Sequence, residues 1–232
     1  MKKYSTILFD ADETLLDFPA CEKAALCSVC DKFGIAFSEE VRATFSAFNL
    51  ALWKQLEKGL ITRDLIKIRR FEQLAEHFSL AADPKEMAVY YVHMLSTFAF
   101  LLDGADKLCE RLSKEHKLYI VTNGIGTVQQ NRLAKSGLLP YFSEVFISEN
   151  IGSQKPSKEF FDFVFENIPE KDKSRIIIVG DSMTSDILGG INAGIDTCFF
   201  NPWGREETYK PTYTAKSFEE LEDILGKKYE NA

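Results

Sequence analysis

The sequence predicts an α/β fold, in which a parallel β-sheet core is covered by helices and interrupted by an all-helical insertion. Three observations lead to this prediction. An apolar run near the start of the chain ends on two aspartates, Asp10 and Asp12. The pattern from 19 to about 100 is helical, with no strand-like run inside it. From Gly104 onward helical segments alternate with short apolar runs, which indicates a parallel sheet with helices on both faces.

The first predicted strand covers 4–9, which is rich in β-branched and aromatic residues and wholly apolar over its last three. This lack of alternation is typical of a strand buried on both faces. Asp10 and Asp12 follow at its carboxyl end, where open α/β sheets bind their ligands. Two carboxylates on a rigid strand end form a hard, oxygen-rich site suited to magnesium. For this stretch alone, a solvated strand-to-loop junction is the alternative.

The region that follows is predicted to form four amphipathic helices, as in a small bundle. Pro19 opens the first helix, Ser38 is the N-cap of the second, and Thr62 caps the third. The fourth begins at 83–86, which supplies an N-cap aspartate, a first-turn proline and a capping-box glutamate. Within the third helix, the basic cluster 67–70 (K-I-R-R) is predicted to be a solvated face.

The alternating pattern after Gly104 predicts four more strands and five helices. The strands are expected at 118–121, 144–147, 176–179 and 196–200, and the helices at 105–115, 127–136, 157–167, 184–193 and 217–225. The α/β core domain is therefore expected to comprise 1–17 and 101–232, with the helical domain at 18–100.

Composition excludes several classes of function. A net charge of −7 and a pI near 5.2 argue against a nucleic-acid polymer or an anionic membrane as the main partner, since both favour basic surfaces. No apolar run reaches the length of a signal peptide or a membrane span, which predicts a cytoplasmic protein. The five cysteines form an odd set without an export signal, so we expect reduced thiols.

Four short segments carry a family resemblance. They are D-A-D-E-T-L at 10–15, I-V-T-N-G at 120–124, Q-K-P at 154–156 and I-V-G-D-S-M-T-S-D at 178–186. Together and in this order they resemble the motifs of the haloacid dehalogenase-like (HAD) superfamily of phosphohydrolases. The resemblance covers nearly the whole chain. It implies a Rossmann-like core with a helical cap inserted between the first and second motifs.

The resemblance also implies roles for individual residues. Asp10 would be the nucleophile that forms an aspartyl-phosphate, and Asp12 the general acid and base. The dehalogenases that name the superfamily lack an acid at the position of Asp12. Thr122 and Asn123 would bind a phosphoryl oxygen through a hydroxyl and a backbone N–H, and Lys155 would supply positive charge.

The implied cofactor is Mg²⁺, held by a side-chain oxygen of Asp10, the backbone carbonyl of Asp12 and the side chain of Asp181. Asp186 has two possible roles: it orients Lys155 or a metal-bound water, or it caps the following helix. Glu13 stands where most members of the superfamily have glycine, which predicts a difference in the local backbone.

Substrate choice is expected to lie in the cap. The D-A-D-E-T-L, G-D-S-M-T-S-D and F-N-P-W-G segments resemble those of a narrower subgroup, the YjjG/YfnB-like phosphatases of pyrimidine nucleoside monophosphates. Candidate base-binding residues are Phe18, Phe45, Phe48, Asn49 and Trp53. For the aromatic residues among them, the alternative is a place in the core of the bundle.

We therefore expect a Mg²⁺-dependent phosphomonoester hydrolase, a nucleoside 5′-monophosphatase that prefers pyrimidines, whose partner is a small-molecule phosphate monoester. A phosphoglycolate or sugar-phosphate phosphatase would differ mainly in the cap. A phosphosugar mutase would use the same Asp10 and Asp12. A binding or regulatory protein on an enzyme scaffold is the non-enzymatic alternative, and the intact set of acids and lysine argues against it.

Overall fold

The computed structural model describes residues 4–226, which divide into two compact units. The first contains the described residues up to Asp17, Leu101–Gly126 and those from Ser136 onward; the second contains Phe18–Phe100 and Thr127–Lys135. The sequence had assigned 127–135 to the core domain. This segment groups with the helical unit because Arg132 donates to the Phe98 carbonyl oxygen at 3.3 Å and lies over the Phe18 ring. The outermost parts of the predicted core, 1–3 and 227–232, lie outside the described residues.

The first unit is built on a six-stranded parallel sheet with the order β3-β2-β1-β4-β5-β6. The strands are β1 (Thr6–Phe9), β2 (Lys117–Thr122), β3 (Phe142–Ile147), β4 (Ile176–Gly180), β5 (Asp196–Phe200) and β6 (Tyr213–Ala215). The five predicted strands are all present. β6 was not predicted, because three residues on a sheet edge carry too short a pattern to recognise.

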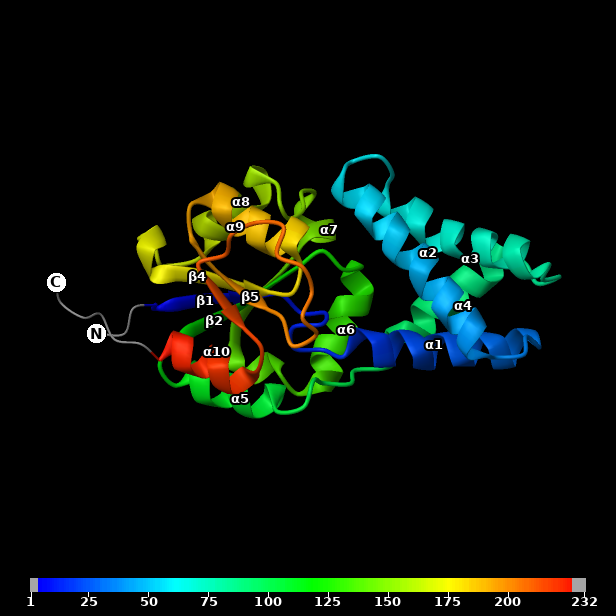
Figure 1. Ribbon diagram of the computed structural model, residues 1–232, viewed down its shortest axis with the longest axis horizontal. Coiled ribbons are helices and arrows are strands. Elements are labelled where there is room, and N and C mark those ends of the chain that lie inside the picture. The colour runs from blue at the N-terminus through cyan, green and yellow to red at the C-terminus, as the bar shows by residue number, and fades with distance from the viewer. Residues whose placement is uncertain (1–3, 227–232) are drawn as a thin grey trace. The chain divides into compact units, whose positions relative to one another are not determined.

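Helices cover both faces of this sheet (Figure 1). They are α5 (Ala105–Ser113), α7 (Ser148–Ile151), α8 (Lys158–Asn167), α9 (Leu188–Ala193) and α10 (Phe218–Leu225), with α5 and α10 on one face and α8 and α9 on the other. Nearly all of α6 (Gly126–Ser136) groups with the second unit. The last three residues of β1 are apolar because both faces of this strand are buried. Ile7 and Phe9 pack into the core beneath α5 and α10, whereas Leu8 packs into the core beneath α8.

The strand order determines where a ligand would bind. From β1 in the centre, the chain first builds β2 and β3 on one side, and then β4, β5 and β6 on the other. The order therefore reverses at β1. Open α/β sheets bind their ligands in the crevice at the carboxyl ends of the strands beside such a reversal. Asp10 directly follows β1 at this point.

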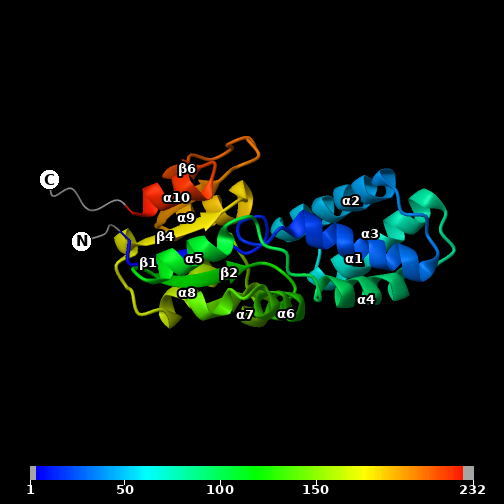
Figure 2. The same ribbon diagram turned by 90° about the horizontal axis from the view of Figure 1, so that it is seen from below.

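The helical unit contains α1 (Phe18–Phe33), α2 (Glu39–Glu57), α3 (Arg63–Phe78) and α4 (Pro84–Leu95), as Figure 2 shows. α1 packs against α4, and α3 packs against both α2 and α4. The Ser38 and Asp83 side chains accept N-cap hydrogen bonds from Val41 N and Lys85 N. Thr62 stands at the N-cap position of α3 but makes no such side-chain bond.

The prediction of a solvated K-I-R-R face is wrong for one residue. Lys67 and Arg69 form exposed ion pairs with neighbours on α3, but Arg70 is buried. Its guanidinium donates to the Asn49 side-chain oxygen at 3.1 Å and lies 4.3 Å from the centre of the Tyr91 ring. Asn49 in turn donates to the buried carboxylate of Glu22 at 2.8 Å. The charge of Arg70 is thus needed inside the bundle, opposite a buried acid.

Two further sequence expectations concern the whole chain. All five cysteines are free, and four of them are buried while Cys27 is half-buried. Among the described residues, no helix combines the length and the apolar character that crossing a membrane requires.

Candidate active site

The site begins where β1 ends. The backbone N–H of Asp10 donates to the Val179 carbonyl oxygen at 2.9 Å, which holds Asp10 beside the end of β4. The chain then turns tightly, because Leu15 N and Leu16 N both donate to the Ala11 carbonyl oxygen, at 3.0 and 2.8 Å. Asp12 lies in this turn, close enough that its charge raises the pKa of Asp10. The two predicted acids therefore lie at the sheet edge where ligands bind.

Lys155 is buried and uses its ammonium group fully. Nζ donates to Asp10 Oδ1, Asp186 Oδ1 and the Val121 carbonyl oxygen, each at 2.6 Å. An ammonium group has three donors, so all are satisfied. Asp10 follows β1, Asp186 follows β4, and Val121 is the last residue but one of β2. One lysine from a loop therefore joins three segments that are far apart in sequence.

Asn123 fixes the backbone of Lys155. Its side-chain Nδ2 donates to the Lys155 carbonyl oxygen at 2.9 Å, and its Oδ1 accepts from Lys155 N at 3.0 Å. The neighbouring Thr122 is buried, and its hydroxyl oxygen accepts from Gly124 N at 3.2 Å. Thr122 ends β2 and Asn123 directly follows it, so both residues lie at the carboxyl end of this strand.

Asp181 and Asp186 come from the segment after β4. Ser182 caps the π-helical turn at Met183–Ile187 by accepting from Ser185 N at 3.2 Å. Asp186 therefore does not act as the N-cap. Its Oδ2 accepts from Ser182 N at 3.1 Å while its Oδ1 accepts from Lys155, so both oxygens are engaged. Gly180 is required here, because a Cβ at that position would lie 2.3 Å from the Asp186 carboxylate.

The acids strongly influence each other. Burial raises the pKa of Asp10 to about 7; Lys155 acts to lower it and Asp186 to raise it. Burial, followed by the charges of Asp10 and Asp186, also raises the pKa of Asp181. Burial opposes the charge on Lys155, yet the two carboxylates beside it raise its pKa. The site therefore has more negative groups than Lys155 alone can compensate.

The sequence predicts no contact for Arg205 or Glu13, which are two further residues of the site. Arg205 follows β5 and donates to Asp181 Oδ2 and to Glu13 Oε1, each at 2.5 Å. Glu13 adopts a positive φ of 57°, so the turn keeps the left-handed conformation that glycine adopts most easily. Arg205 directly follows the F-N-P-W-G segment after the last predicted strand. Its position at a strand's carboxyl end was the available signal.

The predicted base-binding residues all lie in the helical unit. Phe45 and Asn49 are buried inside it, so Phe45 takes the alternative role in the bundle core. Phe18, Phe48 and Trp53 are half-buried. Phe48 lies edge-on to His77, and Trp53 packs against an apolar cluster that contains Leu52, Leu56 and Ile66.

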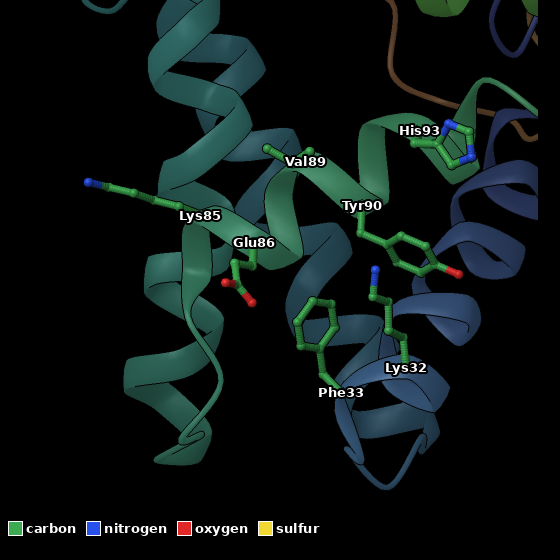
Figure 3. A pocket seen from close by; sticks show the side chains of 7 residues that line it. All are labelled: Lys32, Phe33, Lys85, Glu86, Val89, Tyr90 and His93. Atoms are coloured by element: carbon green, nitrogen blue, oxygen red, sulfur yellow. The ribbon is translucent and has the colours of Figure 1, made fainter.

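A cavity of about 470 Å³ lies on the helical unit between α1 and α4 (Figure 3). It is lined by Lys32, Phe33, Lys85, Glu86, Val89, Tyr90 and His93. The Lys32 ammonium lies 3.9 Å from the centre of the Tyr90 ring and 5.7 Å from that of Phe33. None of the predicted site residues lines this cavity.

Comparison with known proteins determines the family. A model of the haloacid dehalogenase-like hydrolases matches residues 4–194, which contain all four motifs. The chain belongs to this family. This HAD-like hydrolase is 40% identical to the pyrimidine 5′-nucleotidase PynA of Streptococcus pneumoniae, over 97% of the chain and 96% of PynA. It is 37% identical to the pyrimidine 5′-nucleotidase YjjG of Escherichia coli, over 97% of the chain and 99% of YjjG.

The fold comparison agrees. The HAD-like hydrolase superposes with a TM-score of 0.92 on a crystal structure of the HAD-hydrolase YfnB from Bacillus subtilis bound to magnesium. The two are 41% identical, and the match covers 97% of this chain and 99% of YfnB. The expected Rossmann-like α/β core is thus confirmed.

The residues of this HAD-like hydrolase fit a divalent metal ion. Asp10, Asp181 and Asp186 each offer a carboxylate oxygen, and the three oxygens lie within 4.8 Å of one another. Burial and mutual repulsion raise the pKa values of Asp10 and Asp181, so a bound cation would favour the charged form of both. Because Asp186 already binds Lys155 and Ser182 N, Asp10 and Asp181 are the better candidates for ligands. Hard oxygen donors of this kind suit Mg²⁺.

Proposed function

We propose that this HAD-like hydrolase is a Mg²⁺-dependent phosphomonoesterase that acts on nucleoside 5′-monophosphates and prefers pyrimidines. The observation that supports it best is the buried contact of Lys155 with both Asp10 and Asp186, each at 2.6 Å, beside Asp181. A nucleophilic carboxylate, an ammonium group for phosphoryl charge and an acidic metal site then lie at one sheet edge. These are the groups that phosphoryl transfer to a carboxylate requires.

In the first step of the proposed reaction, an Asp10 carboxylate oxygen forms a bond to phosphorus. The bond between phosphorus and the nucleoside 5′-oxygen breaks, and the Asp12 carboxyl donates its proton to that oxygen. The Thr122 hydroxyl and the Asn123 backbone N–H would bind phosphoryl oxygens. Lys155, whose three donors are engaged, would offset phosphoryl charge with its own positive charge. The Asn123 side chain has a second role, because it holds Lys155 in place.

In the second step, a water oxygen attacks the phosphorus of the aspartyl-phosphate and gives a proton to Asp12. The bond between phosphorus and Asp10 breaks, which releases phosphate and restores both side chains to their starting state. Bound Mg²⁺, held by Asp10, Asp181 and the Asp12 carbonyl oxygen, would offset the charge on the phosphoryl group. Asp186 would act by orienting Lys155, in agreement with their contact.

The choice of nucleotide rests on the relatives. PynA and YjjG are pyrimidine 5′-nucleotidases, and each matches almost the full length of this chain. We therefore assign the cap role to the helical domain at 18–100, with Phe18, Phe48 and Trp53 as candidates for contact with the base. Their half-buried side chains retain exposed surface, which stacking on a base requires.

A panel of phosphate monoesters tests the substrate. We expect kcat/KM to be highest for UMP, dUMP and dTMP, lower for AMP and GMP, and lowest for phosphoglycolate and hexose phosphates. A preference for phosphoglycolate or a sugar phosphate would contradict the proposal. Release of phosphate without any bisphosphate activator would exclude the mutase alternative.

Replacement of Asp10 by asparagine tests the nucleophile. Asp10→Asn should lower kcat on the order of 10⁴-fold or more, because an amide oxygen is a poor nucleophile toward phosphorus. Asp106→Asn is a matched control, since Asp106 is exposed in the first turn of α5. Circular dichroism should show both variants folded. Turnover by Asp10→Asn near the wild-type rate would refute the assignment.

A further inference from the structure

Arg205 is held in place from both its backbone and its side chain. The buried Asn201 accepts from Arg205 N through Oδ1 at 2.7 Å, and its Nδ2 donates to the Arg205 carbonyl oxygen at 2.9 Å. The Arg205 guanidinium lies 4.6 Å from the centre of the Trp203 ring. Asn123 binds the backbone of Lys155 through the same pair of hydrogen bonds. Each of the two cations of the site is therefore positioned by its own asparagine, Lys155 by Asn123 and Arg205 by Asn201.

The guanidinium joins two acids from different segments. Nη1 donates to Asp181 Oδ2 and Nη2 donates to Glu13 Oε1, each at 2.5 Å. Only a planar guanidinium can direct two separate nitrogens at two carboxylates in this way. Glu13 holds a left-handed backbone conformation that is unfavourable for a residue with a side chain. The contact with Arg205 gives this glutamate a role in the site.

We propose that Arg205 is a positioning residue for the metal ligand Asp181, and that it favours Mg²⁺ over Ca²⁺. Arg205 holds Asp181 Oδ2 and leaves the other carboxylate oxygen for the cation. Mg²⁺ requires a compact octahedral shell, whereas Ca²⁺ takes six to eight oxygens and often binds both oxygens of a carboxylate. Because Arg205 holds one carboxylate oxygen of Asp181, only the other oxygen remains for the metal ion. This inference rests on the metal site of the proposed function.

A simple surface ion pair is the competing explanation, because the Arg205 side chain is 40% exposed. Such pairs contribute little to stability. A pair that does not orient a metal ligand should leave the preference between Mg²⁺ and Ca²⁺ unchanged. Loss of the Arg205 charge alone would strengthen the binding of both cations, since each is doubly positive. The ratio of the two dissociation constants therefore separates positioning from charge.

The experiment is a calorimetric titration of the metal-free protein with MgCl₂ and with CaCl₂. In Arg205→Gln, we expect the ratio of the Ca²⁺ to the Mg²⁺ dissociation constant to fall about tenfold, as is usual when a residue that orients a metal ligand is lost. Arg205→Lys should also lower the ratio, because an ammonium group keeps the charge but lacks the planar fork. Glu13→Gln should lower it less.

Arg111→Gln is the matched control, with the same change of charge. Arg111 lies in the last turn of α5 and pairs with Glu222 at 2.6 Å. Because α5 leads into the amino end of β2, Arg111 lies toward the amino ends of the strands, away from the site. In Arg111→Gln, the ratio of the Ca²⁺ to the Mg²⁺ dissociation constant should equal that of the wild type. An unchanged ratio in Arg205→Gln, or a wild-type ratio in Arg205→Lys, would overturn the positioning role while the proposed function stands. If the wild type binds neither cation, the metal assignment fails, and the inference with it.

Discussion

Lys155 brings together groups that the chain separates widely. Its ammonium group contacts Asp10, Asp186 and the Val121 carbonyl oxygen, which lie 145, 31 and 34 residues away in sequence. A buried lysine is costly unless its charge is compensated, and two carboxylates compensate it here. The same contacts keep Asp10 charged more readily than its burial would otherwise allow.

The pKa of Asp10 predicts how metal binding depends on pH. Because burial raises this pKa to about 7, Asp10 is largely protonated below that pH in the metal-free protein. A metal ion requires the carboxylate, so binding must release the proton. We expect the Mg²⁺ association constant to fall by about tenfold per pH unit below 7 for each proton displaced, and to level off above.

Calorimetric titrations at pH 5.5, 6.5 and 8, each in two buffers with different heats of ionisation, would measure both the affinity and the protons released. Lys158→Gln is a suitable control, since this exposed lysine pairs with Asp162 outside the site. A Mg²⁺ affinity that stays constant from pH 5.5 to 8 would contradict the raised pKa of Asp10.

At the scale of elements, the helical unit differs from a simple amphipathic bundle. Arg70, Asn49 and Glu22 form a buried chain of hydrogen bonds that links α3, α2 and α1. Ser46 also donates to the Glu22 carboxylate. Tyr91 of α4 packs against the Arg70 guanidinium. All four helices thus contribute to one polar cluster, whose geometry favours a single packing arrangement.

Removal of the Arg70 charge should destabilise this unit. Arg70→Met removes a positive charge that interacts with the buried Glu22 carboxylate, and we expect the free energy of unfolding to fall by about 3 kcal/mol. Arg69→Met is the control: Arg69 is exposed and pairs with Glu72 at 3.3 Å, so its loss should cost about 0.5 kcal/mol or less.

Urea denaturation followed by circular dichroism would measure both changes. The double variant Glu22→Gln, Arg70→Met should recover part of the loss, because it removes the buried negative charge as well. Equal effects of Arg69→Met and Arg70→Met would show that the buried cluster does not contribute as described.

At the scale of the whole molecule, the strand order gathers acids from two separate loops at one sheet edge. Asp10, Asp12 and Glu13 follow β1, Asp181 and Asp186 follow β4, and Lys155 and Arg205 are the cations beside them. Several carboxylates in one place repel each other, which destabilises the metal-free fold. A divalent cation would relieve this repulsion.

Mg²⁺ should therefore stabilise the α/β unit. A cation that binds only the folded state at 100 times its dissociation constant adds about 2.7 kcal/mol to the free energy of unfolding. For a chain of this size, each kcal/mol corresponds to a rise in Tm of about 2–4 °C. We expect differential scanning calorimetry to show a rise in Tm of this size with MgCl₂, and no rise in Tm with NaCl at equal ionic strength.

Asp181→Asn should lose the Mg²⁺-dependent rise in Tm and be more stable than the wild type in excess EDTA, since one repelling charge is gone. Hydrolysis by the wild type should stop in EDTA. Undiminished hydrolysis there, or an equal rise in Tm with NaCl, would argue against a metal at this site.

Much of the fold and of the site could be predicted because the signals are local. The apolar runs that form β1, β2, β4 and β5 are visible in the sequence, and strand-end acids mark the functional edge wherever the strand order reverses. The resemblance of four short motifs to one family, rather than position alone, is what named Asp10, Thr122, Lys155 and Asp181 as candidate site residues. The third helix shows the limit, since Arg70 lies in a basic run that is typical of a solvated face.

The sequence by itself determined the α/β class, the helical insertion and the identity of the acids, because periodicity and strand-end position are properties of short segments. Only the tertiary structure decided that Asp186 binds Lys155, that Arg205 joins Glu13 to Asp181, and that Arg70 enters the bundle core. The physical reason is that each of these contacts joins side chains from separate elements. Their energies depend on distance and burial, which no local pattern of residues contains.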